Sequence, residues 1–319
     1  MSINILITGG AGFIGSSLCD LLVISNFNVI CLDNFDDFYS ENIKRNNIAN
    51  SISHSNFKLI VGDIRNSKLL DKILQDNKIE IIVHLAAKVG VRNSFIIPEE
   101  YFDVNVNGTL QLLKAMQKNN VKNIVFSSSS SVYGNRNGEF SETDITDYQI
   151  SPYAISKKTC ELLTYNFHKN YNINVINLRL FSIYGVRQRP DLVIHKFFNL
   201  INNNLPLEIY GDGNDLRDYT YITDLIDGIY QSILLCLNTE YCIYDIINIG
   251  NSNPISLNNL LKNIKEVNEK EFTVINLPRE KGDVYSTFAN ISKAKKLINY
   301  QPKTNIFEGL IKFKVGLGY

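Results

Sequence analysis

Residues 3–15 read INILITGGAGFIG, and this short stretch decides the predicted fold. The apolar segment from Ile3 to Thr8 predicts a buried strand, and residues 16–23 predict a helix. Between them lies a glycine turn, in which the backbone can bend sharply and approach a ligand closely. Free N–H groups and the dipole at the start of the helix favour a bound phosphate. A strand, a glycine turn and a helix in this order predict a dinucleotide site.

The next predicted strand, residues 29–32, ends at Asp33. In dinucleotide-binding folds, an acidic residue about 20 residues after the glycine turn holds the hydroxyls of the adenosine ribose. A carboxylate at this place would repel the 2′-phosphate of NADP, so Asp33 favours NAD as the cofactor. The alternative is that Asp33 only caps a loop.

Strands and helices alternate along the first part of the chain. Further strands are predicted at residues 57–61, 80–84, 124–126 and 174–180, and helices at residues 68–75, 98–117 and 151–171. This alternation predicts an α/β protein with a Rossmann-type doubly wound parallel sheet. We predict an NAD-binding Rossmann domain over residues 1–180, to which some later segments return. Residues 181–319 are less regular, and we predict that they mainly form a smaller α/β substrate-binding lobe.

A serine run, residues 127–131, follows the apolar segment at residues 124–126. Tyr153 and Lys157 lie about one helical turn apart on the next predicted helix, so they share a face. A lysine beside a tyrosine favours the phenolate and should lower a phenol pKa that is normally about 10. Together with a serine hydroxyl, the pair can take a proton from an alcohol while hydride leaves the same carbon. The alternative is a chance Y-x-x-x-K pattern beside an ordinary serine-rich strand end.

Small and polar residues near the predicted strand ends complete the expected cofactor site. Asp63 and Ile64 should lie at the adenine edge, and residues 85–88 should allow the backbone to pass close to the cofactor. Asn105 is interpreted as a support for the helix that carries Tyr153, with a solvated polar residue as the alternative. The predicted cofactor-binding residues are Gly9, Gly12, Phe13, Ile14, Gly15, Asp33, Asp63, Ile64, Leu85, Ala86, Ala87, Lys88, Asn105, Tyr153 and Lys157.

The bulk composition excludes several classes of protein. The 319 residues carry 32 basic and 32 acidic side chains with no long basic block, so neither nucleic acid nor a membrane surface is an expected partner. Five scattered cysteines without CxxC spacing, and four histidines without ligand spacing, predict neither disulfides nor a metal site. The N-terminus is unlike a signal peptide, and no apolar run reaches membrane length. We expect a soluble cytoplasmic protein.

The motifs in combination resemble the extended short-chain dehydrogenase/reductase family, and within it the nucleotide-sugar 4-epimerases. The motifs that carry the resemblance are TGGAGFIG, the strand end at Asp33, GDI, HLAA, NVNGT, SSSSVYG, YAISK and RDYTYI, and they span nearly the whole chain. The resemblance implies a catalytic trio of Ser129, Tyr153 and Lys157, with NAD as the cofactor. It also implies a UDP-sugar substrate, with Arg217 on the diphosphate and Asp283 on the uridine ribose. A second diphosphate-binding arginine of many relatives is replaced here by Glu280.

The residues after Ser129 indicate which reaction follows. Dehydratase relatives typically carry Asp-Glu directly after the catalytic threonine, and decarboxylase relatives carry a glutamate at the second of these positions. This chain has Ser130 and Ser131 there, which are poor acids and bases at neutral pH. What remains is C4 epimerisation through a transient 4-keto sugar, in which NAD is regenerated at each turnover.

Two loop segments indicate the sugar. GVRNS at residues 90–94 and RQRPD at residues 187–191 resemble UDP-glucuronate 4-epimerases, which convert UDP-glucuronate to UDP-galacturonate. Thr287 occupies the place of a bulky tyrosine of some glucose-specific relatives. The hydroxyls of Ser130, Ser131 and Ser182 could hold the sugar carboxylate against loss of CO2. Arg189 is the expected cationic partner of the substrate, with a solvated surface arginine as the alternative. Arg92 is equally open to substrate contact or a structural salt bridge.

Other interpretations remain open at this point. The nearest is a UDP-glucose or UDP-N-acetylglucosamine 4-epimerase. A more distant one is an NADP-linked reductase of a keto sugar, which Asp33 opposes. A non-catalytic NAD-binding protein is opposed by the intact trio. Relatives pair through the helices that correspond to residues 98–117 and 151–171, so a homodimer is expected. The alternative is that the apolar residues of these helices pack only against their own sheet.

Overall fold

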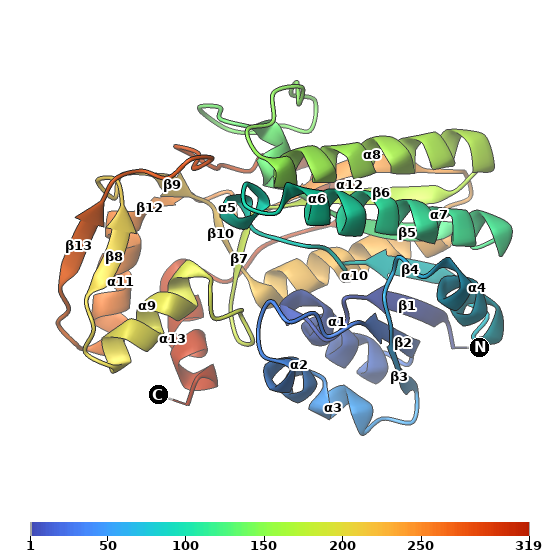
Figure 1. The fold of residues 1–319 in the computed structure, drawn as a ribbon, viewed down its shortest axis with the longest axis horizontal. Helices are drawn as coiled ribbons and strands as arrows, with labels where there is room; N and C mark the ends of the chain where they lie inside the picture. Colours follow the sequence, from blue (N-terminus) through green and yellow to red (C-terminus); the bar gives the residue numbers. More distant parts are fainter. Residues whose placement is uncertain (1, 319) are drawn as a thin grey trace.

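A seven-stranded parallel sheet forms the centre of the computed structural model, which describes residues 2–318 (Figure 1). Every neighbouring pair of strands in this sheet runs parallel. In spatial order the strands are β11 (Tyr244–Ile249), β6 (Asn174–Leu180), β5 (Asn123–Ser129), β4 (Ile81–His84), β1 (Asn4–Thr8), β2 (Asn28–Asp33) and β3 (Phe57–Val61). The strand order reverses between β1 and β4, which is where ligands bind in such sheets. The predicted fold class is confirmed.

Helices cover both faces of the sheet (Figure 1). One face carries α1 (Phe13–Ile24) and α10 (Ile222–Asn238), and the other carries α4 (Ser67–Asp76), α7 (Gly108–Lys118) and α8 (Pro152–Tyr171). Side chains alternate along β1, so Ile5 and Ile7 join one apolar cluster while Leu6 joins the other. Burial on both faces explains why the strands are nearly continuous apolar runs.

A smaller lobe follows β6 and contains three two-stranded sheets. Its elements are β7 (Ser182–Tyr184), α9 (Val193–Asn202), β8 (Leu207–Tyr210), β9 (Leu216–Arg217), β10 (Tyr219–Tyr221), β12 (Ile255–Ser256), α11 (Leu257–Asn268), β13 (Val274–Leu277) and α13 (Ile306–Gly316). Helix α12 (Ser292–Ile298) instead packs against α10 and β11 of the large sheet. Strand β11 lies between these elements in the sequence, but it pairs with β6 and so completes the large sheet. The division of the chain at residue 180 stays a prediction.

The segment predicted as one regular helix over residues 98–117 is interrupted. It consists of α6 (Pro98–Tyr101), a π-helical stretch (Phe102–Asn107) and α7. π-helical turns occur frequently at functional sites. Here the wide turn contains Asn105, whose amide bonds the backbone of Lys88 on a neighbouring loop. Periodicity alone could not show this, because the apolar spacing changes little across one wide turn.

Two short helices, α2 (Glu41–Asn47) and α3 (Ala49–Ile52), lie beside α1 in the segment that connects β2 to β3. Among residues 2–318, no helix has the length and apolar character needed to cross a bilayer.

Candidate active site

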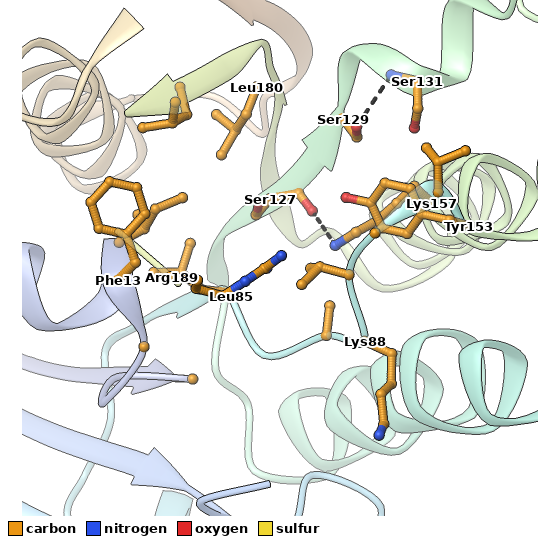
Figure 2. A pocket seen from close by; sticks show the side chains of 18 of the residues that line it. Phe13, Leu85, Lys88, Ser127, Ser129, Ser131, Tyr153, Lys157, Leu180 and Arg189 are labelled. Atoms are coloured by element: carbon orange, nitrogen blue, oxygen red, sulfur yellow. Dashed lines mark hydrogen bonds between the residues drawn. The ribbon is translucent and has the colours of Figure 1, made fainter. Parts of the chain in front are cut away.

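A cavity of about 590 Å³ opens at the carboxyl ends of the parallel strands (Figure 2). Its walls come from the segments that follow β1, β2, β4, β5 and β6, and from loops of the smaller lobe. Residues far apart in the sequence therefore line one space, as the doubly wound sheet predicts.

The glycine turn forms one wall of this cavity and cannot accept larger residues. Gly9 has φ +70°, and a Cβ atom there would lie 2.8 Å from the backbone nitrogen of Ala86. A Cβ atom on Gly15 would collide with the carbonyl oxygen of Gly9. Helix α1 starts at Phe13, and no side chain caps its first turn at Gly12. Backbone N–H groups at this end are thus available to an anion.

Asp33 closes β2 beside the glycine turn. Its two carboxylate oxygens accept hydrogen bonds from the backbone nitrogens of Ala11, at 3.0 Å, and Phe35, at 2.8 Å. These bonds fix the carboxylate at the cavity wall. Each oxygen retains a further lone pair, so the group can also accept hydrogen bonds from a pair of hydroxyls.

Helix α8 carries the tyrosine–lysine pair, and its start is well defined by the sequence. Pro152 occupies the first turn, and the Ser151 hydroxyl accepts a hydrogen bond from Ala154 N at 3.1 Å. Tyr153 and Lys157 both line the cavity. Lys157 Nζ donates to the carbonyl oxygen of Ser127 at 2.8 Å, as Figure 2 shows.

The serine run lies against this pair. Strand β5 continues through Ser129, because the serines pair with β6 in regular register. The strand is thus longer than the predicted residues 124–126. Residues 130–133 then form a single 3₁₀ turn, in which Ser131 N donates to Ser129 Oγ at 3.2 Å. Figure 2 shows the Ser129 side chain beside the ring of Tyr153.

Burial dominates the electrostatics of the pair. It raises the pKa of Tyr153, while the hydrogen bond with Ser129 and the charge of Arg189 act in the opposite direction. The prediction that the phenol pKa is lowered is therefore wrong for the net shift. Burial destabilises the phenolate more than the hydrogen bond and the nearby charge stabilise it. Burial also lowers the pKa of Lys157 to about 8. The lysine is still mainly charged at neutral pH.

Most predicted cofactor residues line the cavity. Those that do are Gly9, Gly12, Phe13, Ile14, Gly15, Asp33, Asp63, Ile64, Leu85, Ala86, Ala87, Lys88, Tyr153 and Lys157. Asn105 is outside this set. It is buried, its Oδ1 accepts from Lys88 N at 2.7 Å, and its Nδ2 donates to Ser156 Oγ at 2.9 Å. Asn105 thus joins the loop after β4 to helix α8, a position consistent with its interpretation as a support for the helix that carries Tyr153.

Six of the seven predicted substrate residues also line the cavity: Ser130, Ser131, Ser182, Arg189, Arg217 and Asp283. Arg92 is the exception. It lies on α5 (Val91–Ser94), bonds Asp283 at 2.9 Å and stacks on the ring of Tyr210 at 4.0 Å. These contacts correspond to the alternative interpretation of Arg92 as a structural salt bridge. They connect the first domain to the loop that carries Asp283.

Arg189 lies inside the cavity rather than on a solvated loop. Its guanidinium pairs with both oxygens of Asp191, at 2.9 and 2.7 Å, and its side chain is 14% exposed. The ring of Phe38 lies 5.2 Å from it. The neighbouring Arg187 bonds Asp20 of α1 at 2.7 Å, which ties the loop to this helix.

Lys44 and Gln188 are two polar examples of cavity residues that the sequence patterns did not predict. Lys44 of α2 is buried and lines the cavity near Asp33, and Gln188 lines it beside Arg189. Lys44 lies in a polar segment, where nothing in the sequence distinguishes it from Arg45. Gln188 is one letter of the RQRPD segment, and only its buried position marks it. Within residues 2–318 no group of three or more His, Cys, Asp or Glu side chains is arranged to hold a metal ion.

The sheet, the glycine turn, Asp33 and the Tyr153–Lys157 pair are together typical of a class of dinucleotide-binding proteins. The family model described as GDP-mannose 4,6 dehydratase matches residues 6–313. The chain belongs to this family, which is part of the extended short-chain dehydrogenases/reductases.

Relatives and solved structures share the whole fold. A UDP-glucuronate 4-epimerase of Thermodesulfobacterium geofontis is 38% identical, with 96% of this chain and 93% of that protein covered. The structure of a UDP-glucuronic acid 4-epimerase from Bacillus cereus with UDP-glucuronic acid and NAD has a TM-score of 0.91 at 36% identity, with 99% of each chain covered. A UDP-glucose 4-epimerase from Thermotoga maritima with UDP-glucose has a TM-score of 0.89 at 31% identity, again with 99% of each chain covered.

Proposed function

We propose that this chain is an NAD-dependent UDP-sugar 4-epimerase that interconverts UDP-glucuronate and UDP-galacturonate. The observation that carries the proposal is the meeting of Ser129, Tyr153 and Lys157 at one end of a cavity whose other end holds the glycine turn and Asp33. Likeness to the Thermodesulfobacterium and Bacillus enzymes supports the same reaction and cofactor.

The residues present fit NAD. The glycine turn is free of Cβ atoms, which would collide with neighbouring backbone at Gly9 and Gly15. The uncapped start of α1 can bind the pyrophosphate through its backbone N–H groups. Asp33 can hold the adenosine ribose hydroxyls, and its charge disfavours a 2′-phosphate there. Asp63 and Ile64 would flank the adenine, while Lys88 and Tyr153 would lie toward the nicotinamide. When bound, NAD would supply reversible hydride acceptance at C4 of the sugar.

The chain's own residues would move the proton. Tyr153 would take the O4 proton as general base while Ser129 hydrogen-bonds the same oxygen. The hydrogen bond with Ser129 and the guanidinium of Arg189 favour the phenolate against the opposing effect of burial. The Lys157 ammonium, one helical turn from Tyr153, would act in the same direction. After the 4-keto sugar has rotated, Tyr153 would return the proton to O4 while hydride would return to the opposite face of C4, which leaves the C4 configuration inverted.

The groups next to Ser129 favour epimerisation over elimination. Ser130 and Ser131 occupy the positions at which an acid and a base would be needed to expel water. Ser131 Oγ is buried and has no hydrogen-bond partner among residues 2–318. A sugar carboxylate could accept bonds from Ser130, Ser131 and Ser182, which would hold it in an orientation unsuited to loss of CO2.

The nucleotide half of the substrate would lie toward the smaller lobe. Arg217 of β9 faces the cavity and could pair with the diphosphate. Asp283 lies at the same end and could accept bonds from the uridine ribose, while Arg92 holds its carboxylate in place. Arg189 would contact the sugar or phosphate from the first-domain side of the cavity.

A neutral UDP-sugar is the second candidate substrate. The likeness to the Thermotoga UDP-glucose 4-epimerase favours it. The small Thr287 side chain at the cavity wall does not separate the candidates that carry an extra substituent, because it leaves room for one at C5 or at C2. A UDP-N-acetylglucosamine 4-epimerase also fits this geometry. A non-catalytic NAD-binding protein would have no need of the assembled Ser129, Tyr153 and Lys157.

The proposed function is tested by NMR of the purified protein, without added cofactor, incubated separately with UDP-glucuronate, UDP-glucose and UDP-N-acetylglucosamine. UDP-galacturonate as the single product would support the proposal in full. Conversion of a neutral sugar alone would keep the mechanism and contradict the assignment of the carboxylate site. A UDP-pentose or an accumulating 4-keto sugar would contradict the role given to the serines.

The pH dependence of kcat/KM should rise from acidic pH and level off near pH 8. The active form carries both the Tyr153 phenolate and the Lys157 ammonium, and the pKa of Tyr153 is raised while the pKa of Lys157 is about 8. Above about pH 8, the further gain of phenolate is therefore offset by loss of the ammonium. Rates of epimerisation measured from about pH 6 to about pH 10 would show this levelling. A Lys157→Arg variant should keep rising above about pH 8, because a guanidinium stays charged. A wild-type profile that falls steeply from about pH 8, or that rises without a break to about pH 10, would contradict the prediction.

We further propose that the chain is a cytoplasmic homodimer. Ile155, Leu162 and Tyr165 on α8 are 41%, 58% and 45% exposed, and they form an apolar stripe on the outer side of this helix. Burying such a stripe against a second copy would remove apolar surface from water. Sedimentation of the purified protein at twice the 36.3 kDa chain mass would support the dimer. A particle of one chain mass would contradict it.

A further inference from the structure

A buried ion pair lies directly behind the serine run. Arg179 of β6 and Glu161 of α8 are each 1% exposed. Arg179 Nε donates to Glu161 Oε1 and Nη2 donates to Oε2, both at 2.9 Å. This two-point geometry fixes the orientation of the carboxylate as well as its position.

The same carboxylate also holds the strand that carries Ser129. Glu161 Oε1 accepts a hydrogen bond of 2.6 Å from Ser128 Oγ, and Ser128 precedes Ser129. Glu161 lies one helical turn after Lys157, whose ammonium bonds the carbonyl oxygen of Ser127. Helix α8 is therefore hydrogen-bonded to β5 at two successive residues, Ser127 and Ser128, immediately before Ser129.

The guanidinium of Arg179 also contacts the segment that follows Ser129. It lies 4.7 Å from the centre of the Tyr133 ring, and Tyr133 ends the 3₁₀ turn. The Tyr133 hydroxyl donates to Asn248 Oδ1 of β11 at 2.7 Å. The Arg179–Glu161 pair thus contacts the residue before Ser129, which is Ser128, and also Tyr133 in the turn that follows Ser129.

Stability alone does not account for such a pair. Removing two charges from water costs several kcal/mol for each ion, and well-packed apolar residues of similar volume are often as stabilising. One guanidinium nitrogen, Nη1 of Arg179, also lacks a partner among residues 2–318. What apolar side chains could not provide is a directional bond to the Ser128 hydroxyl.

We propose that Glu161, held by Arg179, is a positioning residue that sets the Ser129 hydroxyl against Tyr153 and Lys157. This inference rests on the proposed function, since it assigns the pair to the alignment of that site. Catalytic groups must be held within about 0.5 Å of their working geometry. The tyrosine and the lysine are on α8 and the serine is on β5, so a contact between these elements controls their separation.

The decisive variant is Ser128→Ala, which removes the bond to Glu161 and leaves the ion pair and every residue of the trio in place. We expect kcat to fall about tenfold or more while KM stays within about twofold, since misplacing a catalytic group by 1 Å can cost about 10²-fold. Ser128→Thr keeps a hydroxyl and should recover most of the rate. Ser232→Ala is the matched control, because it removes a buried hydroxyl that bonds Gly228 O on α10, away from the cavity.

Hydrogen exchange gives a second readout that needs no turnover. The backbone amides of residues 129–133 should exchange about tenfold faster in Ser128→Ala than in the wild type, and at unchanged rates in Ser232→Ala. A Ser128→Ala protein with wild-type kcat, or with unchanged exchange at these amides, would overturn the inference. A wild type that epimerises no UDP-sugar would refute the proposed function instead, and the exchange rates alone would then decide on the positioning role.

Discussion

Tyr153→Phe is expected to lower kcat for epimerisation by about 10²–10⁴-fold, the usual contribution of a positioned acid–base group. The substitution keeps the aromatic ring and its edge-on packing against Tyr101, at a centroid distance of 6.2 Å. It removes only the hydroxyl that would take the O4 proton. Cofactor content and melting temperature should therefore stay close to those of the wild type. Initial rates from NMR, with the NAD content of the denatured protein, measure both effects.

Tyr101→Phe is the matched control for this prediction. Tyr101 is also a buried tyrosine, and its hydroxyl donates to the carbonyl oxygen of Val89 at 2.8 Å. Its removal deletes one hydrogen bond beside the site but no proton-transfer group, so activity should remain within about tenfold of the wild type. Equal losses in the two variants, or near wild-type activity of Tyr153→Phe, would assign the general base to another residue.

Glu161→Met is expected to lower the free energy of unfolding by about 3–5 kcal/mol, because Arg179 is left as a buried charge without its partner. The bidentate contact and the bond to Ser128 are both lost. Chemical denaturation in urea, followed by circular dichroism, measures the change. The double variant Glu161→Met with Arg179→Met should recover most of the lost stability, since no buried charge then remains.

An exposed ion pair provides the comparison for this stability loss. Lys265 and Glu271 are 2.7 Å apart, and their side chains are 52% and 84% exposed. Glu271→Gln should change the free energy of unfolding by less than about 1 kcal/mol. Equal and small effects at Glu161 and Glu271 would show that Arg179 relaxes or is solvated when its partner is removed. A double variant as unstable as Glu161→Met would show that packing, rather than charge, is what the site requires.

Much of the cofactor half of the site could be predicted because its signals are local. The turn from Gly9 to Gly15, the strand end at Asp33 and the spacing of Tyr153 and Lys157 each lie within a short stretch. Short stretches of this kind determine backbone conformation and shared helical faces. Alternating strands and helices then require a parallel sheet, which places all these strand ends at one edge. The fold class and fourteen of the fifteen expected cofactor residues were therefore found at the cavity.

The tertiary structure decided what depends on contacts between distant segments. Arg92 pairs with Asp283 across 191 residues of sequence, and no local pattern distinguishes that contact from a bond to substrate. Asn105 bonds Ser156 across 51 residues, inside a π-helical stretch that apolar periodicity did not show. The sign of the Tyr153 pKa shift also depends on burial, which is a property of the packed molecule.

The sequence by itself therefore determined the parallel sheet, the glycine turn, the serine run and the tyrosine–lysine pair, because each depends on residues that are close together in the sequence. Only the folded chain decided which charged residues pair with one another and which face the cavity. Glu161 shows the difference: in the sequence it is one more acidic residue on a helix, four positions after Lys157. Folding buries its carboxylate, which is then stabilised by the guanidinium of Arg179 on β6 and by a hydrogen bond from the Ser128 hydroxyl on β5. The physical reason is that electrostatic and hydrogen-bond energies depend on distance in space, which the order of residues does not contain.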